Sequence, residues 1–168
     1  NMLLSDKLST PYIEDLDKKN ILLNDLIKNA CDMFYQTEQK LKIINSANIN
    51  PLLFVDNYKM TLAIKNLIDN ALKYSSPDKL VELSINEHEK SIEVCVKDFG
   101  AGITKEQINK ITKPLYRGRA AKEKNKTGFG LGLAITKKIV EAHEGQLKIN
   151  SIINEWSEFV IILPKENN

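Results

Sequence analysis

Apolar residues recur at helical spacing over one long segment of the chain. Between positions 57 and 75 they are Met60, Ile64, Leu67, Ile68, Ala71 and Leu72. Steps of three and four positions place such residues on one side of an α-helix. Asp56 or Asn57 can cap the start of this helix, and Ser75-Ser76-Pro77 ends it. The pattern therefore predicts an amphipathic helix over 57–75.

Short apolar runs predict strands on both sides of this helix. The runs 80–85 and 92–96 are joined by polar residues, which favours a hairpin. Other strands are expected around Leu26 and at 42–44, 52–55, 146–150 and 159–163, with a turn at 48–51. Further helices are expected from after the Leu26 strand to about 39, near 105–111, and over 130–143. This mixture predicts an α+β fold, a two-layer sandwich in which about three helices cover one face of a mixed, mostly antiparallel sheet.

The composition is that of a folded domain without a strong electrostatic bias. The chain has 168 residues, of which 42% are hydrophobic and 27% are charged. Lysine and arginine number 24 and the acids 22, a formal net charge of +2, so overall charge does not indicate nucleic-acid binding. No apolar run approaches the roughly 18 residues of a membrane helix, so no membrane contact is expected. Cys31 and Cys95 lack metal-binding spacing and are expected as buried, reduced thiols in the cytosol.

A polar stripe follows the long predicted helix. Asn66, Asn70 and Lys73 stand at i, i+4 and i+7, and therefore share one side of it. Two amides and an ammonium group in a row suit phosphate, and an Asn oxygen together with phosphate oxygens can hold Mg²⁺. The alternative is an ordinary solvated helix face.

A second candidate follows the predicted strand 92–96. Asp98 continues the register of the apolar positions of this strand, so its carboxylate is expected to face the core. A buried carboxylate needs hydrogen-bond donors, which an exocyclic amine such as that of adenine can supply. Gly100 and Gly102 would let a flat ring approach the backbone. The alternative is an ordinary turn, in which Asp and Gly are common.

A third candidate is the glycine-rich stretch that leads into the predicted helix 130–143. Gly128, Gly130 and Gly132 alternate there, and the free N–H groups at a helix start attract anions. A basic loop from Lys113 to Gly128 leads into them, and its densest run of charge begins at Arg117. The alternative for this loop is a solvated surface segment.

The order of these motifs resembles the ATP-binding catalytic domain of bacterial sensor histidine kinases, over roughly 25–164. That family shares its fold, the Bergerat-type ATP-binding fold, with gyrase, Hsp90 and MutL-type ATPases. The stretch 66–75 resembles the N-box of the family, Asp98-Phe-Gly100-Ala-Gly102 its first glycine box, and 128–133 its second. Leu115 stands where the family usually has an aromatic residue.

The resemblance implies roles for the residues of the N-box. Asn70 would be the Mg²⁺ ligand and Asn66 would support it. Lys73 and Tyr74 would contact phosphate and ribose or line the pocket.

It also implies roles around the other two boxes. Asp98 would accept a hydrogen bond from the adenine amine. Gly100 and Gly102 would belong to the same ATP-binding pocket. The second-box glycines Gly128, Gly130 and Gly132 would flank the triphosphate. Arg117 would stabilise charge on the γ-phosphoryl group.

The implied reaction is transfer of the γ-phosphoryl group of Mg-ATP to a histidine of a separate dimerisation domain, for relay to a response regulator. Asn66 stands where hydrolytic relatives have a glutamate base, so poor ATP hydrolysis is predicted. The two histidines of the chain, His88 and His143, are expected to be structural or solvated. An ATPase or serine kinase of the same fold, or a nucleotide-sensing interaction module, remain alternatives.

The resemblance also gives the expected organisation of the chain. Residues 1–20 would be the tail of an upstream dimerisation and phosphotransfer helix with its linker, and 21–168 the catalytic domain, with a lid at about 113–128. The domain is expected in the cytoplasm, with the full-length protein anchored in the inner membrane.

Overall fold

The structure is a computed structural model that describes residues 13, 15–34, 40–44, 49–116 and 130–165. Its main sheet has five strands in the order β2-β4-β5-β7-β6. Their bounds are β2 Leu41–Ile44, β4 Val81–Glu87, β5 Ser91–Asp98, β6 Gln146–Ile152 and β7 Trp156–Pro164. The β2–β4 pair is parallel, and the other three pairs are antiparallel. The predicted mixed, mostly antiparallel sheet is therefore confirmed.

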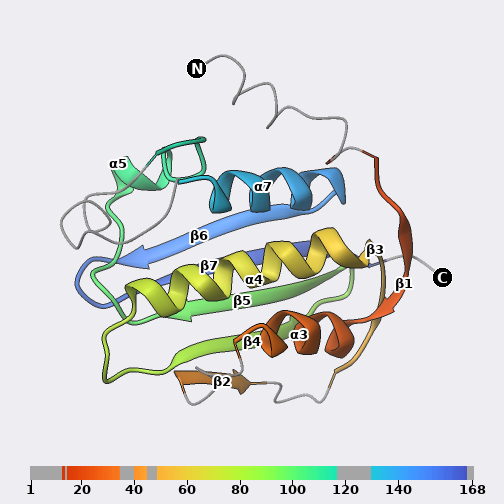
Figure 1. Ribbon diagram of the computed structural model, residues 1–168, viewed down its shortest axis with the longest axis horizontal. Helices are drawn as coiled ribbons and strands as arrows, with labels where there is room; N and C mark the ends of the chain where they lie inside the picture. The colour runs from red at the N-terminus through yellow and green to blue at the C-terminus, as the bar shows by residue number, and fades with distance from the viewer. Residues whose placement is uncertain (1–12, 14, 35–39, 45–48, 117–129, 166–168) are drawn as a thin grey trace.

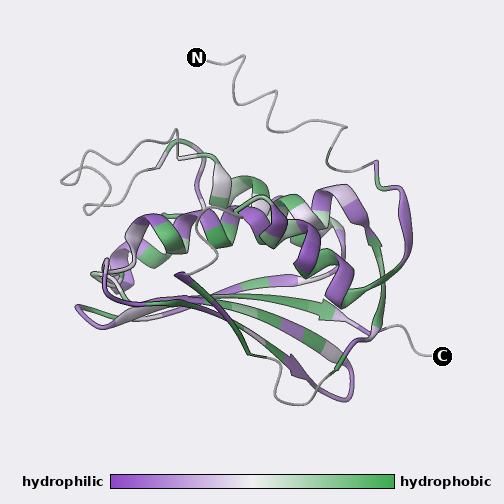
Figure 2. Cartoon of the chain, turned by 60° about the horizontal axis from the view of Figure 1, so that its bottom comes forward, coloured by the Kyte–Doolittle hydropathy of each residue, from purple (hydrophilic) through white to green (hydrophobic). Residues whose placement is uncertain are grey.

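Three helices cover one face of this sheet: α3 Leu23–Asp32, α4 Asn57–Tyr74 and α7 Gly132–Ala142. Figure 1 shows α4 running across the middle of the sheet, with α3 on one side and α7 on the other. Figure 2 separates the helix layer from the sheet layer, as expected for a two-layer sandwich. Leu67 and Ile68 of α4 and Val96 of β5 are fully buried between the layers. Each such side chain stabilises the fold by about 1.5–3 kcal/mol relative to exposure.

Helix α4 begins and ends almost where its sequence pattern predicts. The Asp56 side chain accepts a hydrogen bond from the Lys59 N–H and so caps the first turn. The C-cap is Ser75, whose extended backbone turns the chain away from the helix. These two ends fix the polar stripe of α4 relative to the sheet.

The prediction of a strand around Leu26 was wrong. Leu26 is buried within α3, and the strand β1 lies earlier, at Lys18–Leu22. β1 pairs with β3, Leu52–Asp56, as an antiparallel two-stranded ribbon separate from the main sheet. The residues that hold β1 in place thus lie thirty or more positions away, and tertiary pairing of this kind overrides local propensity. The ribbon begins at Lys18, three residues before the expected domain start at 21.

Two other boundaries also differ from the predictions. The first helix ends at Asp32 rather than near 39, although 35–39 lie outside the described residues. The short helix α5 covers Lys105–Ile108 and not 105–111. Its start is fixed by a capping box in which Thr104 and Gln107 bond each other's backbone N–H.

Candidate functional site

Two of the three motifs meet at one end of the fold. The C-terminal end of α4 contacts the turn that follows β5, through an isolated bridge between Ser75 and Gly100. The Ser76 N–H donates to the Phe99 carbonyl at 3.1 Å, and the Phe99 N–H donates to Ser75 Oγ at 3.2 Å. The N-box helix and the first glycine box are therefore joined by backbone and side-chain hydrogen bonds.

The third motif joins α4 through Asn66. Its Nδ2 lies 3.4 Å from the carbonyl oxygen of Gly132, the first residue of α7. The N-cap residue of α7, Leu131, supplies no side-chain hydrogen bond to this helix end. The first N–H groups of a helix lack partners within it, so an α7 start without a side-chain cap suits an anion.

Asp98 ends β5 and is buried, with 3% of its surface exposed. Its Oδ1 accepts the Gly100 N–H at 3.1 Å, and the Ser157 hydroxyl also donates to the carboxylate. Burial raises the pKa of Asp98 to about 6, and these two hydrogen bonds only partly offset that effect. An aspartate of an ordinary turn would be solvated, so the predicted inward orientation is confirmed. A buried acceptor of this kind suits a ligand amine.

Ser157 is a site residue that the sequence reasoning missed. It pairs directly with Asp98 across the β5–β7 register and is 3% exposed. Ser151 of β6 lies behind it, 3.4 Å away between the hydroxyl oxygens, and accepts the Ile103 N–H at 2.8 Å. The available signal was a hydroxyl at an inward position of β7, two residues before the buried Phe159. A polar side chain in an apolar register needs a partner, and here the partner is the Asp98 carboxylate.

The glycines of the first box are required by the fold itself, and their expected role toward a ligand stays a prediction. A Cβ on Gly100 would lie 2.1 Å from the Tyr74 carbonyl oxygen, so only glycine allows the turn to approach α4. A Cβ on Gly102 would lie 2.4 Å from the carbonyl oxygen of Ile152. These contacts belong to the protein itself, and access for a flat ring is not needed to explain them.

Gly132 differs from these glycines. Among the described residues, apart from its chain neighbours and its own helix backbone, the nearest atom to a Cβ there would be Asn66 Cγ at 3.8 Å, which is an ordinary van der Waals distance. Packing against the described residues therefore does not require glycine at this position. The missing side chain leaves space between Asn66 and the first turn of α7, whose N–H groups lack partners within the helix.

Lys73 forms an ion pair with Asp69, with 2.5 Å between Nζ and Oδ2. Both side chains are about one-third exposed, at 34% and 33%. Lys73 also lines a cleft of about 120 Å³ at the C-terminal end of α4, together with Lys40, which directly precedes β2. Asn70 and Tyr74 are partly buried on the same helix. The carboxylate of Asp69 is thus already engaged by a cation.

The two sides of the predicted lid meet at Gly130. The Leu115 N–H donates to the Gly130 carbonyl at 3.0 Å, and Gly130 has a φ of +70°. Leu115 is 58% exposed. Residues 117–129 lie outside the described part of the chain, so the structure does not place Arg117 or Gly128.

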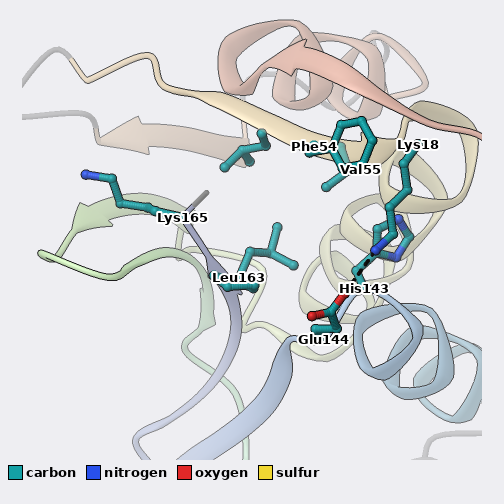
Figure 3. A pocket seen from close by; sticks show the side chains of 9 residues that line it. Lys18, Phe54, Val55, His143, Glu144, Leu163 and Lys165 are labelled. Carbon is teal, nitrogen blue, oxygen red and sulfur yellow. Dashed lines mark hydrogen bonds and ion pairs between the residues drawn. The ribbon is translucent and has the colours of Figure 1, made fainter. Parts of the chain in front are cut away.

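The two histidines lie apart from this end of the fold. His88 is in the β4–β5 turn with 53% of its side chain exposed, 3.3 Å from Glu93. His143 is 3% exposed at the end of α7 and borders a different cleft, of about 240 Å³ (Figure 3). The expectation that both are structural or solvated is confirmed. Cys31 and Cys95 are buried free thiols, as predicted.

The few oxygen ligands that the site offers suit a metal ion that is bound mainly by the phosphates of a nucleotide. Among the described residues, no group of three His, Cys, Asp or Glu side chains is placed to hold a metal ion. Mg²⁺ commonly uses one or two protein oxygens and completes its shell with phosphate and water, which fits a single Asn70 oxygen.

In the described part of the chain, no helix is long and apolar enough to span a membrane.

Comparison with known proteins matches this geometry. A family model described as histidine kinase-, DNA gyrase B- and HSP90-like ATPase covers residues 55–167. Sensor protein RprX of Bacteroides fragilis is 33% identical over 159 residues, which are 91% of this chain and 30% of that protein. Sensor protein kinase WalK of Staphylococcus haemolyticus is 33% identical over 163 residues, 96% of this chain and 26% of WalK.

The chain therefore spans about a third or less of the length of these relatives. The mycobacterial sensor histidine kinase MprB has the same fold, with a TM-score of 0.75 and 22% identity over 88% of this chain and 97% of that structure. The family match contains α4, Asp98 and α7, which are the elements that form the site. The chain belongs to the family of histidine kinase-, DNA gyrase B- and HSP90-like ATPases, as an ATP-binding catalytic domain of the sensor histidine kinase type.

Proposed function

We propose that this domain binds Mg-ATP between α4, the turn after β5 and the start of α7, and transfers the γ-phosphoryl group to a histidine of a separate dimerisation domain. A nitrogen of that imidazole attacks the γ-phosphorus, the bond to the β-phosphate oxygen breaks, and ADP leaves. A response regulator would then receive the phosphoryl group on an aspartate.

The nucleotide would be held from both ends. Asp98 accepts the adenine amine, and Gly100 and Gly102 shape the turn that carries Asp98. At the other end, the N–H groups at the start of α7 face the phosphates beside Gly132. Leu131, the N-cap residue of α7, makes no side-chain hydrogen bond to this helix end, so phosphate binding there would not compete with a side-chain cap from that residue.

The remaining binding residues lie on α4 and around the second glycine box. Asn70 would hold Mg²⁺ with its side-chain oxygen, and the ion would neutralise phosphate charge. Tyr74 and Lys73 would contact ribose and phosphate. Gly128, Gly130 and Arg117 would act around the triphosphate.

The observation that carries the choice of transferase over hydrolase is the side chain of Asn66. It points to Gly132 at the start of α7, where a hydrolase of this fold needs a base to activate water. A carboxamide does not accept a proton at ordinary pH. The neighbouring Asp69 carboxylate is paired with Lys73. The site can thus orient ATP and stabilise charge, but its described residues include no free base for water.

The phosphoacceptor would lie outside this domain. His143 is buried and hydrogen-bonded to the Ile139 carbonyl. His88 lies in the β4–β5 turn, before the start of β5, whereas Asp98 is at the other end of that strand. We therefore place the acceptor on a separate dimerisation domain, which would be joined to this domain through the segment that precedes β1. The domain would act in the cytoplasm, with the full-length protein anchored in the inner membrane.

The test uses this chain, labelled ATP, Mg²⁺ and the dimerisation domain supplied as a separate polypeptide. Acid-labile label on the dimerisation domain is expected, because phosphohistidine is hydrolysed by acid. Asn70→Ala should abolish transfer and weaken Mg²⁺-dependent nucleotide binding. Asn57→Ala is the matched control, an exposed asparagine at the opposite end of the same helix.

Three outcomes would contradict the proposal. Acid-stable label would indicate a serine kinase. Rapid phosphate release by the chain alone would indicate a hydrolase. Nucleotide binding without any transfer would indicate a nucleotide-sensing module.

A further inference from the structure

A buried polar cluster lies at the end of the fold opposite the nucleotide site. Its members are Asp56, Lys59 and His143, whose exposed fractions are 7%, 6% and 3%. Lys59 and Asp56 form an ion pair, with 3.1 Å between Nζ and Oδ2. The nucleotide site uses none of these residues, because they sit at the start of α4 and the end of α7.

The cluster holds the backbone of the segment that enters the domain. The Asp17 N–H donates to Asp56 Oδ2 at 3.2 Å, and the Lys59 ammonium donates to the Asp15 carbonyl oxygen. Burial alone would raise the pKa of Asp56. The hydrogen bonds and the ion pair with Lys59, together with the Asp17 N–H, outweigh burial and hold that pKa below its ordinary value. The carboxylate is therefore charged and fully engaged at neutral pH.

The same cluster is bonded to α7. The Asp56 N–H donates to His143 Nε2 at 2.9 Å, and His143 Nδ1 lies 2.7 Å from the carbonyl oxygen of Ile139. These partners assign the proton to Nδ1 of a neutral ring. Burial lowers the pKa of His143, so the ring keeps this form at neutral pH.

A second, more exposed contact also links the entering segment to the end of α7. Lys18 of β1 reaches Glu144 just after α7, with 3.4 Å between Nζ and Oε1. Figure 3 shows this pair beside the cleft, with His143 next to it and Phe54 of β3 near the Lys18 side chain. The entering segment is thus joined to the end of α7 directly, through Lys18 and Glu144, and indirectly, through Asp56 and His143.

Stability alone does not account for this arrangement. Buried ion pairs are often no more stabilising than apolar side chains of the same size, because desolvation offsets their attraction. What apolar side chains could not do is bond the backbone of Asp15 and Asp17 in one geometry. Directional bonds to an otherwise exposed segment fix its course relative to α4 and α7.

We propose that Asp56, Lys59 and His143 are positioning residues for phosphoryl transfer, because they fix the direction in which the chain enters the domain. The inference rests on the proposed function. α4 and α7 both run from this cluster to the nucleotide site, where Asn66 meets Gly132. The direction of the entering segment therefore sets where the γ-phosphoryl group points relative to an acceptor on the same polypeptide.

This role predicts a difference between attached and separate acceptors. A reaction within one polypeptide gains rate from a fixed orientation, which a loosened connection loses. A separately supplied acceptor does not use the connection. Loss of the cluster should therefore slow transfer only where the acceptor is covalently attached.

The test compares Asp56→Asn/Lys59→Met with wild type. The double variant keeps the side-chain sizes and leaves no unpaired buried charge. Transfer to the acceptor on the same polypeptide should fall by about tenfold. Transfer to a separate dimerisation domain, and the affinity for ATP, should change less than twofold. Lys19→Met is the matched control, since it removes an exposed ion pair with the Asp17 side chain and leaves the cluster intact.

His143→Asn cuts the connection on the α7 side alone and should give the same difference. Equal rates with the attached acceptor in wild type and in both variants would overturn the inference. An equal fall in attached transfer, separate transfer and ATP affinity would also overturn it, because it would show a merely structural role. If wild type labels neither acceptor, the proposed function itself fails, and this inference with it.

Discussion

Replacing Asp98 by asparagine should stabilise the nucleotide-free domain at neutral pH. The carboxyl group has a pKa of about 6 in the folded protein, against 3.8 for its ordinary value. A difference of about 2 pH units corresponds to about 3 kcal/mol, since each unit is 1.36 kcal/mol. Burial is the cause of the shift, so this energy is the cost of keeping a charged carboxylate in the interior.

The sign of the pH dependence follows from the direction of the shift. Between about pH 4 and pH 6 the folded state binds more protons at Asp98 than the unfolded state does. The contribution of the protonated group is fully present below pH 4 and is lost as the pH rises through 6. An asparagine side chain at this position would not titrate, so the variant should lack this part of the pH dependence.

The expected gain for Asp98→Asn at pH 7.5 is about 1–3 kcal/mol. The upper figure is the whole cost of the charge, and the lower one allows for weaker hydrogen bonds from Gly100 and Ser157 to a neutral oxygen. ATP binding should be lost at the same time, because the acceptor for the adenine amine has changed.

The assay is urea unfolding of both proteins between pH 4.5 and 8 without nucleotide, with ATP binding measured in parallel. Asp78→Asn, at an exposed position in the segment after α4, is the control and should change the free energy of unfolding by less than about 0.5 kcal/mol. A variant that is less stable than wild type at pH 7.5, or one whose stability keeps the wild-type slope from pH 4.5 to 6, would refute this account of Asp98.

Three further predictions rest on the packing. Gly100→Ala should reduce the free energy of unfolding by about 2 kcal/mol or more in urea, because its Cβ would lie 2.1 Å from the Tyr74 carbonyl oxygen; an unchanged midpoint would contradict this. Gly132→Ala should leave the unfolding midpoint unchanged or higher, because the nearest atom of the other described elements would be 3.8 Å from the new Cβ, and yet weaken ATP binding in calorimetry, because the methyl group would occupy the proposed phosphate space; equal losses in both would contradict it. In a Cys31→Ser background, Cys95 should react with a thiol reagent at pH 8 only as fast as the domain opens, because the residue is 4% exposed in the folded protein, where burial also raises the pKa of its thiol to about 11; rapid labelling of folded protein would show that the thiol is accessible.

The parts of the fold that the sequence predicted are those with a local pattern. α4 and the β4–β5 hairpin carry their own periodicity and end signals, so their positions were predicted nearly to the residue. β1 has no such pattern, since Lys18, Lys19 and Asn20 are polar. It exists because β3 pairs with it, and Leu26 was misassigned because its apolar neighbours suit a helix as well as a strand.

The candidate site divides in the same way. The inward orientation of Asp98 follows from strand alternation and could be predicted. The role of Ser157 depends on the register between β5 and β7, which are far apart in sequence, so it could not. The close approach of α4 to the turn at Gly100 is likewise a tertiary contact. The roles given to Arg117 and Gly128 stay predictions, because these residues lie outside the described part of the chain.

The hydrogen bond between Leu115 and Gly130 has a consequence for how this family can vary. It joins the described residues on the two sides of 117–129, so we expect the packing of the described elements to depend little on how many residues lie between Leu115 and Gly130. Doubling the length of such a connection costs only about 0.6 kcal/mol of closure entropy. Evolution, or a protein engineer, can therefore splice residues into this position, including a reporter peptide, while the rest of the domain keeps its architecture.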